Sequence, residues 1–170
     1  MLTPIRIAVD AMGGDNSPEK VIRGISLHSI NKEAILYNIF GDVDKISEFI
    51  KKYPIQQNYE LFDTKEKISN EDTALSAAKK GKNTSMWKAI NSVKCKESDV
   101  VVSAGNTGAL FVIAKLNIPM IENIDKPALS ALWPNKIGMN VVLDLGANVE
   151  CNEKNLIDFS LMGAALHKSL

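Results

Sequence analysis

The chain has 170 residues, 45% of them hydrophobic, which suffices for a globular domain with a substantial core. Its twenty basic and twenty acidic residues cancel, and this excludes a global electrostatic field that would recruit nucleic acid or a membrane surface. No apolar run approaches the ~20 residues of a membrane span, the start lacks a signal-peptide pattern, and the two cysteines indicate no disulfide framework. We therefore expect a reduced, cytoplasmic protein whose membrane contacts, if any, are peripheral.

Short apolar runs alternate with helical patterns along the chain, which predicts βαβ units. Ser17-Pro18-Glu19 has the residue types of a helix start, with Ser17 as the N-cap. The run Val100-Val101-Val102 predicts a buried strand. The predicted strands cover residues 5–10, 34–40, 59–62, 99–103, 128–133 and 140–144, and the predicted helices after the one at Ser17 cover residues 43–52, 74–80, 85–95, 107–118 and 159–170. Together they predict a single α/β domain over residues 1–170, with three α/β/α layers and a mostly parallel sheet.

Three Gly-rich turns each follow one of these apolar runs directly. They are Asp10-Ala11-Met12-Gly13-Gly14-Asp15, Ser103-Ala104-Gly105-Asn106-Thr107-Gly108 and Asp144-Leu145-Gly146-Ala147-Asn148. Ligands of open α/β sheets bind beyond the carboxyl ends of the strands, and glycine lets backbone N–H groups come close to an anion. The turns therefore predict a site for a small oxyanion.

The second turn supplies the most candidate donors. A helix is predicted to open there, so that its free N–H groups and the positive end of its dipole face the strand tips. Asn106 and Thr107 add side-chain donors, and Ser103 stands at the end of the preceding strand. The alternative interpretation is a tight strand-to-helix turn that Thr107 caps.

The other two turns supply fewer donors. Gly13 and Gly14 permit the same close approach of backbone to ligand. Asn148, after Gly146, is expected either to donate to a ligand or to form an Asx turn.

Carboxylates stand in the first and third turns. Asp10, Asp15 and Asp144 repel an anion unless they orient a cation or take a proton, and the alternative is that they accept N–H bonds of the turns. They form no complete ligand set, so no metal is predicted. Cys151 is expected to be a buried, inert thiol rather than a nucleophile.

A basic stretch, Lys79-Lys80-Gly81-Lys82, lies between the first two turns. Its lysines are expected either to neutralise an anionic substrate or acidic partner, or to form a solvated helix end.

Three segments, Ile5–Glu19, Val101–Leu110 and Leu143–Cys151, resemble the bacterial phosphate acyltransferases of the PlsX family in order and spacing. The intervening Thr84-Ser85-Met86, with its upstream lysines, matches the family as well. The resemblance implies transfer of a fatty acyl group from acyl carrier protein to inorganic phosphate, giving an acyl phosphate for phospholipid synthesis, and it implies no cofactor. It also implies a fold like that of isocitrate and isopropylmalate dehydrogenases, a homodimer, and a cytoplasmic location that includes peripheral contact with the inner membrane face. The resemblance covers the amino-terminal half of the family's length. Lysines stand at residues 79–82 where the family favours arginine, which binds bidentately.

We accordingly assign Asn106, Thr107, Asp10 and Asn148 as the expected catalytic residues. The expected substrate-binding residues are Gly13, Gly14, Asp15, Ser103, Gly105, Gly108, Gly146, Lys79 and Lys82. Two other functions stay open. One is a phosphotransacetylase-like enzyme that uses acyl-coenzyme A, and the other is an inactive, truncated fragment that binds the carrier protein or dimerises.

Overall fold

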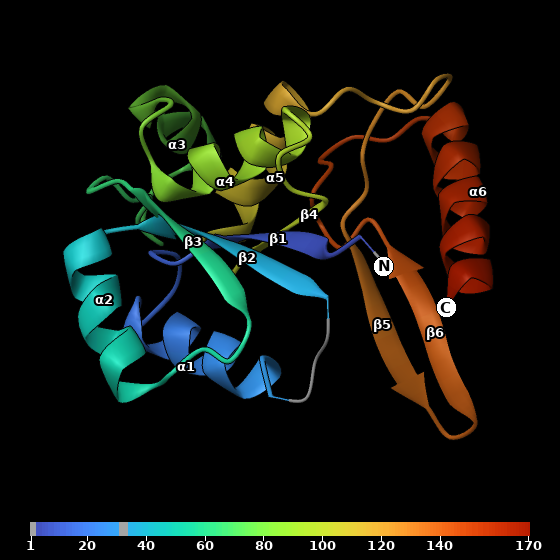
Figure 1. Cartoon of the computed structure of the whole chain (residues 1–170). Coiled ribbons are helices and arrows are strands. Elements are labelled where there is room, and N and C mark those ends of the chain that lie inside the picture. Colours follow the sequence, from blue (N-terminus) through green and yellow to red (C-terminus); the bar gives the residue numbers. More distant parts are fainter. Residues whose placement is uncertain (1–2, 31–33) are drawn as a thin grey trace. The chain divides into compact units, whose positions relative to one another are not determined.

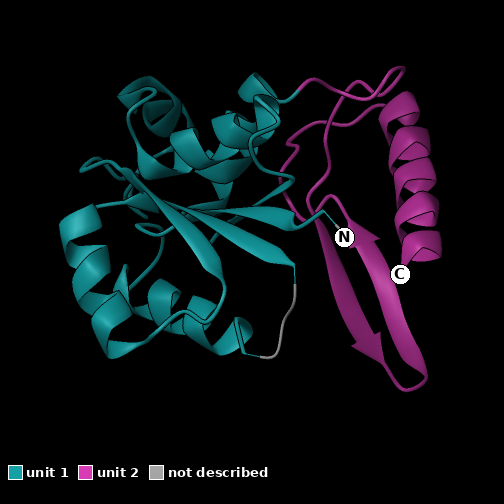
Figure 2. Cartoon of the chain, viewed as in Figure 1, with its two compact units in different colours: residues 1–118 teal, residues 119–170 magenta. Residues whose placement is uncertain are grey.

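The computed structural model describes residues 3–30 and 34–170. The chain divides into two compact units, Met1–Ile118 and Pro119–Leu170 (Figure 2). The expectation of a single domain over residues 1–170 stays a prediction.

The first unit is built on a parallel sheet in the order β3-β2-β1-β4 (Figure 1). The two central strands are the most deeply buried, and this agrees with their near-continuous apolar sequences. The bounds of the strands are β1 (Ile5–Asp10), β2 (Ile35–Gly41), β3 (Asn58–Asp63) and β4 (Val100–Ser103). The strands predicted for this part of the chain are confirmed to within one residue or a few.

Helices cover both faces of this sheet, which makes the first unit an α/β/α sandwich (Figure 1). On one face, Val9 and Ile39 of the sheet pack with Ile22 and Ile46 of the helices. On the other face, Ala8 packs with Ala89, which lies in the helix of residues 85–94. Each fully buried aliphatic side chain contributes about 1.5–3 kcal/mol to stability. The helices are α1 (Glu19–His28) and α2 (Val43–Lys52) on the first face, and α3 (Ala74–Lys80), α4 (Ser85–Lys94) and α5 (Thr107–Asn117) on the second.

The start of α1 differs from the prediction. Ser17 does not cap this helix, because its hydroxyl donates to the carbonyl oxygen of Gly13 at 2.5 Å. Pro18 occupies the N-cap position instead, without a side-chain cap. This hydrogen bond links Ser17, two residues after the first Gly-rich turn, back to Gly13 within the turn.

Strand β4 was expected to be buried, and this was wrong. Val100 is 44% exposed and Val102 is 52% exposed. The reason is that β4, among the described residues, pairs with β1 alone and so forms an edge of the sheet, while Val101 packs against the layer of α4 and α5.

The second unit consists of a hairpin of β5 (Ser130–Asn135) and β6 (Gly138–Leu143), followed by α6 (Glu153–Ser169). The strand before the third Gly-rich turn was expected to be parallel, but β6 is antiparallel to β5. Only two residues separate the strands, and a parallel connection needs a dozen or more. Helix α6 begins earlier than expected because Asn152 and Asn155 form a capping box. None of the helices in the described residues has the length and apolar character needed to cross a membrane.

Candidate functional site

The first two Gly-rich turns meet at the carboxyl ends of β1 and β4. A Cβ atom on Gly13 would lie 2.9 Å from both the amide nitrogen of Gly105 and Oγ of Ser103. A Cβ atom on Gly14, which has φ of 84°, would lie 2.5 Å from the carbonyl oxygen of Ala104. Both distances are too short for any side chain, so the close approach of the two turns depends on glycine.

Asp10 lies beneath this junction and is only 1% exposed. Its Oδ1 accepts hydrogen bonds from Oγ of Ser85 at 2.6 Å and from the amide of Met12 at 3.2 Å. Its Oδ2 accepts one from Oγ of Ser103 at 2.7 Å, and the same Oγ accepts from the amide of Gly105 at 3.1 Å. Asp10 thereby joins the first turn, the second turn and the start of α4. Of the two predicted roles, this geometry supports the carboxylate that accepts hydrogen bonds and positions the turns.

Ser85 was missed by the sequence analysis as a site residue. It lies in the first turn of α4, and Thr84 caps that helix by accepting from the amide of Trp87 at 3.4 Å. The signal in the sequence is the pair Thr84-Ser85, in which the first hydroxyl caps the helix and leaves the second to face inward. Ser85 itself is 1% exposed.

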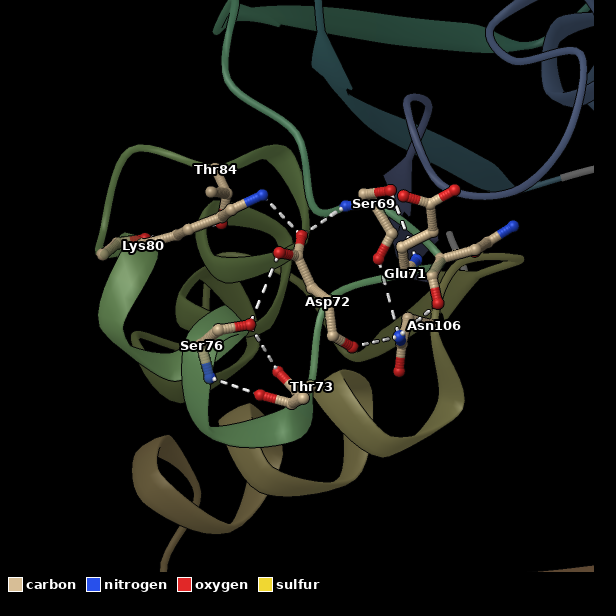
Figure 3. A network of polar contacts seen from close by, with 10 residues as sticks. Ser69, Glu71, Asp72, Thr73, Ser76, Lys80, Thr84 and Asn106 are labelled. Carbon is tan, nitrogen blue, oxygen red and sulfur yellow. Dashed lines mark hydrogen bonds and ion pairs between the residues drawn. The ribbon is translucent and has the colours of Figure 1, made fainter.

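Asn106 caps α5, where Thr107 was the cap of the alternative interpretation. Its Oδ1 accepts from the amide of Ala109 at 3.0 Å. Its Nδ2 donates to the carbonyl oxygens of Asp72 at 2.8 Å and Asn70 at 3.2 Å, as Figure 3 shows for Asp72. The amide hydrogens of Asn106 are thus taken by the segment before α3, and the side chain holds the start of α5 in place.

The free donors at the start of α5 are mainly backbone groups. Thr107 and Gly108 are exposed. Among residues 3–30 and 34–170, no acceptor bonds to the amide N–H of either residue or to the Thr107 hydroxyl. A helix of 11 residues brings partial positive charge to these groups, so this end of α5 suits an anion.

Charged groups around the segment before α3 are partly paired with one another (Figure 3). Asp72 accepts from Nζ of Lys80 at 2.5 Å and from the amide of Ser69 at 2.7 Å. The hydrogen bond from Lys80 is the main cause that lowers the pKa of Asp72. Asp15 is exposed and accepts from Nδ2 of Asn70 at 3.1 Å.

The two lysines assigned to substrate binding are both exposed, at residues 79 and 82. Lys82 borders a hollow of about 520 Å³ that is also lined by Phe62, Trp87 and Lys88. Asp10 and the two turns are not among the residues that line this hollow. Lys82 therefore lies at this hollow, whose lining does not include those residues.

The third turn belongs to the second unit. Nδ2 of Asn148 donates to Oδ1 of Asp144 and to the carbonyl oxygen of Pro127, at 2.9 Å each. Asp144 has φ of 57° and Gly146 has φ of 79°, so the turn is held by left-handed residues and by an Asx-type contact. Of the two roles predicted for Asn148, this arrangement supports the structural one.

The Asn148 hydrogen bond is the main cause that lowers the pKa of Asp144. Cys151 is exposed, so the expectation of a buried thiol was wrong. The pKa of its thiol is raised, first by partial desolvation and then by the hydrogen bond to Asp144. A raised pKa keeps the thiol protonated at neutral pH, which argues against a nucleophilic role. In the described part of the chain, no three His, Cys, Asp or Glu side chains gather into a group that could hold a metal ion.

Residues 5–170 match the model of a family described as "Fatty acid synthesis protein". A phosphate acyltransferase from Pelagibacter ubique is 63% identical over 166 residues, which cover 98% of this chain and 50% of the relative. One from Parvibaculum lavamentivorans is 43% identical over 167 residues, covering 97% of this chain and 46% of the relative. One from Xanthobacter autotrophicus is 38% identical over 172 residues, covering 100% and 48%. The chain thus spans about half the length of the curated relatives it matches.

Proposed function

The chain belongs to the fatty acid synthesis protein family, and on this premise we propose that it forms part of an acyltransferase that moves a fatty acyl group from acyl carrier protein to inorganic phosphate. The acyl phosphate product supplies phospholipid synthesis. The names of the relatives support the acyltransferase class, and the geometry of the first unit supports the phosphate.

The observation that carries the proposal is the meeting of two Gly-rich turns beside the start of α5. The amide N–H groups of Thr107 and Gly108 and the Thr107 hydroxyl have no acceptor among the described residues. A phosphate oxygen satisfies them, and the partial charge of about +0.5 at a helix N-terminus adds attraction. The negative charge of Asp10 opposes binding less than an unpaired carboxylate would, because three donors already bind its oxygens.

The proposed reaction needs placement more than it needs a strong base. A phosphate oxygen forms a bond to the thioester carbonyl carbon, the carbonyl oxygen takes the negative charge, and the C–S bond then breaks to release the thiolate of the carrier. A thiol has a pKa of about 8.5, so the thiolate leaves readily. Placing two reactants side by side is worth effective molarities of ~10⁵ M or more, and fixed N–H donors stabilise the oxyanion.

Acyl carrier protein as the donor is part of the proposal. Exposed Lys79 and Lys82 support an acidic partner, and Lys82 and Lys88 flank the hollow at Trp87. We expect Lys82→Glu to raise the KM for acyl carrier protein thioesters and to leave the KM for the same acyl-coenzyme A unchanged. Equal effects on both donors would contradict a carrier-protein contact at this position.

For the complete protein we also propose the fold of isocitrate and isopropylmalate dehydrogenases. The parallel order β3-β2-β1-β4 with helices on both faces supports it. In such open sheets the ligand lies beyond the carboxyl ends of the strands, which is where the two turns meet.

The test is formation of acyl phosphate from labelled phosphate, with this chain assayed alone and together with the remaining half of the Pelagibacter ubique relative. Thr107→Val keeps the side-chain shape and removes the hydroxyl, and Thr3→Val is the matched control at another exposed threonine. Loss of a hydrogen bond to a charged ligand corresponds to about 1.5–3 kcal/mol, so we expect Thr107→Val to lower kcat/KM for phosphate by about 10-fold or more.

Unchanged kcat/KM in Thr107→Val would refute the phosphate assignment. Turnover with acyl-coenzyme A and none with the carrier-protein thioester would favour the phosphotransacetylase-like function. Carrier-protein binding without turnover in either preparation would favour the inactive fragment.

A further inference from the structure

The hollow of about 520 Å³ beside α4, here called the Trp87 hollow, is lined by none of the residues of the two Gly-rich turns. Its volume is within the range of about 300–1,000 Å³ that is typical of small-molecule sites. Its wall combines aromatic rings, lysines and hydrogen-bond acceptors, among them Phe62, Trp87, Lys82, Lys88, Asn91 and Glu97. The proposed acyl transfer gives a role to the two lysines and none to the rings, the amide or the carboxylate.

Aromatic rings form the flat part of the Trp87 hollow. Phe62 of β3 stacks on Phe40 of β2, with ring centroids 4.6 Å apart and an interplanar angle of 15°. Phe40 is 4% exposed and packs with Ala8 and Ala89, so Phe62 lies against a fixed part of the core. Trp87 reaches the hollow from the first turn of α4. Rings that the fold holds in place suit a flat aromatic ligand, because stacking depends on a rigid face.

The polar groups of the hollow follow one another along α4. Lys82 precedes the helix, Lys88 lies in its first turn, Asn91 lies three residues later on the same face, and Glu97 follows the last turn. The dipole of α4 is positive at the end near Lys82 and negative at the end near Glu97. An anionic group therefore fits beside the two lysines, and a group with hydrogen-bond donors fits beside Asn91 and Glu97.

These charges are not neutralised within the described part of the chain. In residues 3–30 and 34–170, neither lysine of the hollow nor Glu97 takes part in an ion pair. Nζ of Lys88 donates to the carbonyl oxygen of Asp63 at 3.0 Å, which holds the side chain in place and leaves it two further hydrogens. The carboxylate of Asp63 is 3.6 Å from Nζ of Lys65, so it opposes an anion less than a free carboxylate would.

The loop that carries Glu97 is anchored to the sheet and to α4. Nδ2 of Asn38, on β2, donates to the main-chain carbonyl oxygen of Glu97 at 3.2 Å and to Oγ of Ser98 at 2.8 Å. The amides of Glu97 and Ser98 donate to the carbonyl oxygen of Ser92 at 2.8 and 3.1 Å. The backbone of Glu97 is thus fixed, while its carboxylate bonds to none of the described residues and can accept from a ligand.

We propose that the Trp87 hollow binds a guanine nucleotide. The base stacks on Trp87 and Phe62, its N1–H and N2–H groups donate to the two oxygens of Glu97, and the phosphate groups bind Lys82 and Lys88. Nothing in this binding requires acyl transfer, so it is a function beyond the one proposed above.

The choice of guanine follows from the chemistry of Glu97. An ionised carboxylate only accepts hydrogen bonds, so it matches the edge of guanine, which has two adjacent donors. Adenine places a ring nitrogen with a lone pair beside its amino group, and this nitrogen repels the second carboxylate oxygen. A fatty acyl chain fits less well still, because it would desolvate two lysines and a carboxylate without satisfying them.

The experiment titrates the full chain in a Trp133→Phe background, in which Trp87 is the one remaining tryptophan, with GDP, ADP and pyrophosphate. We expect saturable quenching of Trp87 by GDP below about 1 mM, with at least tenfold weaker binding of ADP and pyrophosphate. Equilibrium dialysis with labelled GDP measures the same binding without relying on fluorescence.

Two variants test the two ends of the hollow. Glu97→Gln replaces one acceptor oxygen by a donor and is expected to lower the affinity for GDP at least tenfold. Lys82→Gln removes a charge at the phosphate end and is expected to lower it at least fivefold. The matched controls, Glu48→Gln and Lys51→Gln, are at exposed positions of α2 and should bind GDP as the parent does. Urea midpoints equal to that of the parent show that each variant is folded.

Several results would overturn the assignment. Equal affinities for GDP and ADP, or an unchanged GDP affinity in folded Glu97→Gln, would contradict recognition of guanine by the carboxylate. Pyrophosphate that binds as tightly as GDP would reduce the site to a contact between lysines and an anion, and dialysis without bound GDP at about 1 mM would remove the site. None of these measurements involves an acyl donor or turnover, so the outcome is separate from that of the proposed activity.

Discussion

Replacing Gly13 by alanine tests the junction on which the proposed site depends. A Cβ atom there would lie 2.5 Å from Oδ2 of Asp10 and 2.9 Å from both Oγ of Ser103 and the amide nitrogen of Gly105. None of these atoms can move aside easily. The amide nitrogen is backbone, and the two side-chain oxygens are held by hydrogen bonds to each other and to the amide of Gly105. The second turn must therefore shift away from the first.

The expected change in the free energy of unfolding follows from two opposing effects. Overpacking at a tight site costs about 1–3 kcal/mol, while the loss of glycine freedom in the unfolded chain returns about 0.4–1 kcal/mol. We expect Gly13→Ala to lower the free energy of unfolding of the first unit by about 0.6–2 kcal/mol. With an m-value of about 2 kcal/mol/M, the urea midpoint falls by about 0.3–1 M.

Gly24→Ala is the matched control, because the new Cβ meets nothing within 4 Å and the residue lies inside α1. Alanine is favoured over glycine in a helix interior, so the midpoint should rise by about 0.2–0.5 M. Both variants are measured by Trp87 fluorescence in a Trp133→Phe background, so that the signal comes from the first unit alone. A midpoint in Gly13→Ala equal to or above that of the parent would refute the close approach of the two turns.

Three further variants test other contacts. Asn106→Ala removes the cap of α5 and is expected to lower the free energy of unfolding by about 0.5–2 kcal/mol in the same urea assay. The Lys80 hydrogen bond lowers the pKa of Asp72, so this pair stabilises the native state above the unfolded carboxyl pKa of about 3.9 and stops doing so as the pH falls through the lowered native pKa. The urea midpoints of wild type and Asp72→Asn should therefore converge between about pH 5 and pH 2. Cys151→Ser should change acyl phosphate formation less than about twofold, and the raised pKa of Cys151 should make its alkylation at pH 7 slower than that of free cysteine.

Local patterns predicted most elements of the first unit. Helices α2 and α3 have the predicted bounds. An amphipathic pattern marks the extent of α2, and Gly81 marks the end of α3. Strand β1 also has its predicted bounds. These features are local in sequence and need no knowledge of the neighbours in the fold.

The errors arose where the outcome depends on partners distant in sequence. Three valines predict burial at residues 100–102, but burial depends on what covers the strand, and in the part of the chain that the structure describes β4 pairs with a strand on one side only. Ser17 has the chemistry of a cap, yet the carbonyl of Gly13 takes its hydroxyl. Strand β6 was predicted to be parallel because a Gly-rich turn follows it, but it is antiparallel to β5. The short connection between the two strands, which excludes a parallel pair, was already visible in the sequence.

In the candidate site, too, the sequence indicated which residue types are present but not which partners their side chains contact. The residue types predicted one site formed by all three turns; the structure brings the first two together at strand ends, and the third turn belongs to the second unit. The roles of the side chains depended on partners that spacing alone does not reveal. Asn106 was expected to donate to a ligand, and it donates instead to the segment before α3. Ser85 was not selected, because neither its place after a capping threonine nor its place in the segment Thr84-Ser85-Met86 shows that it contacts Asp10.

These assignments leave the proposed phosphate site with donors that are mostly main chain. The carboxylate of Asp10 and the hydroxyls of Ser85 and Ser103 hold the two turns together, and Asn106 holds the start of α5, but none of these side chains has a free hydrogen to offer a ligand. Their substitution acts on the ligand through the position of the backbone, so it should change stability and phosphate affinity together. Thr107→Val removes a hydroxyl that bonds to none of the described residues, and it should change phosphate affinity while the urea midpoint stays within about 0.2 M of wild type. If the anion site is made of backbone donors, variants of the four supporting side chains lose stability and phosphate affinity together, whereas Thr107→Val loses phosphate affinity alone.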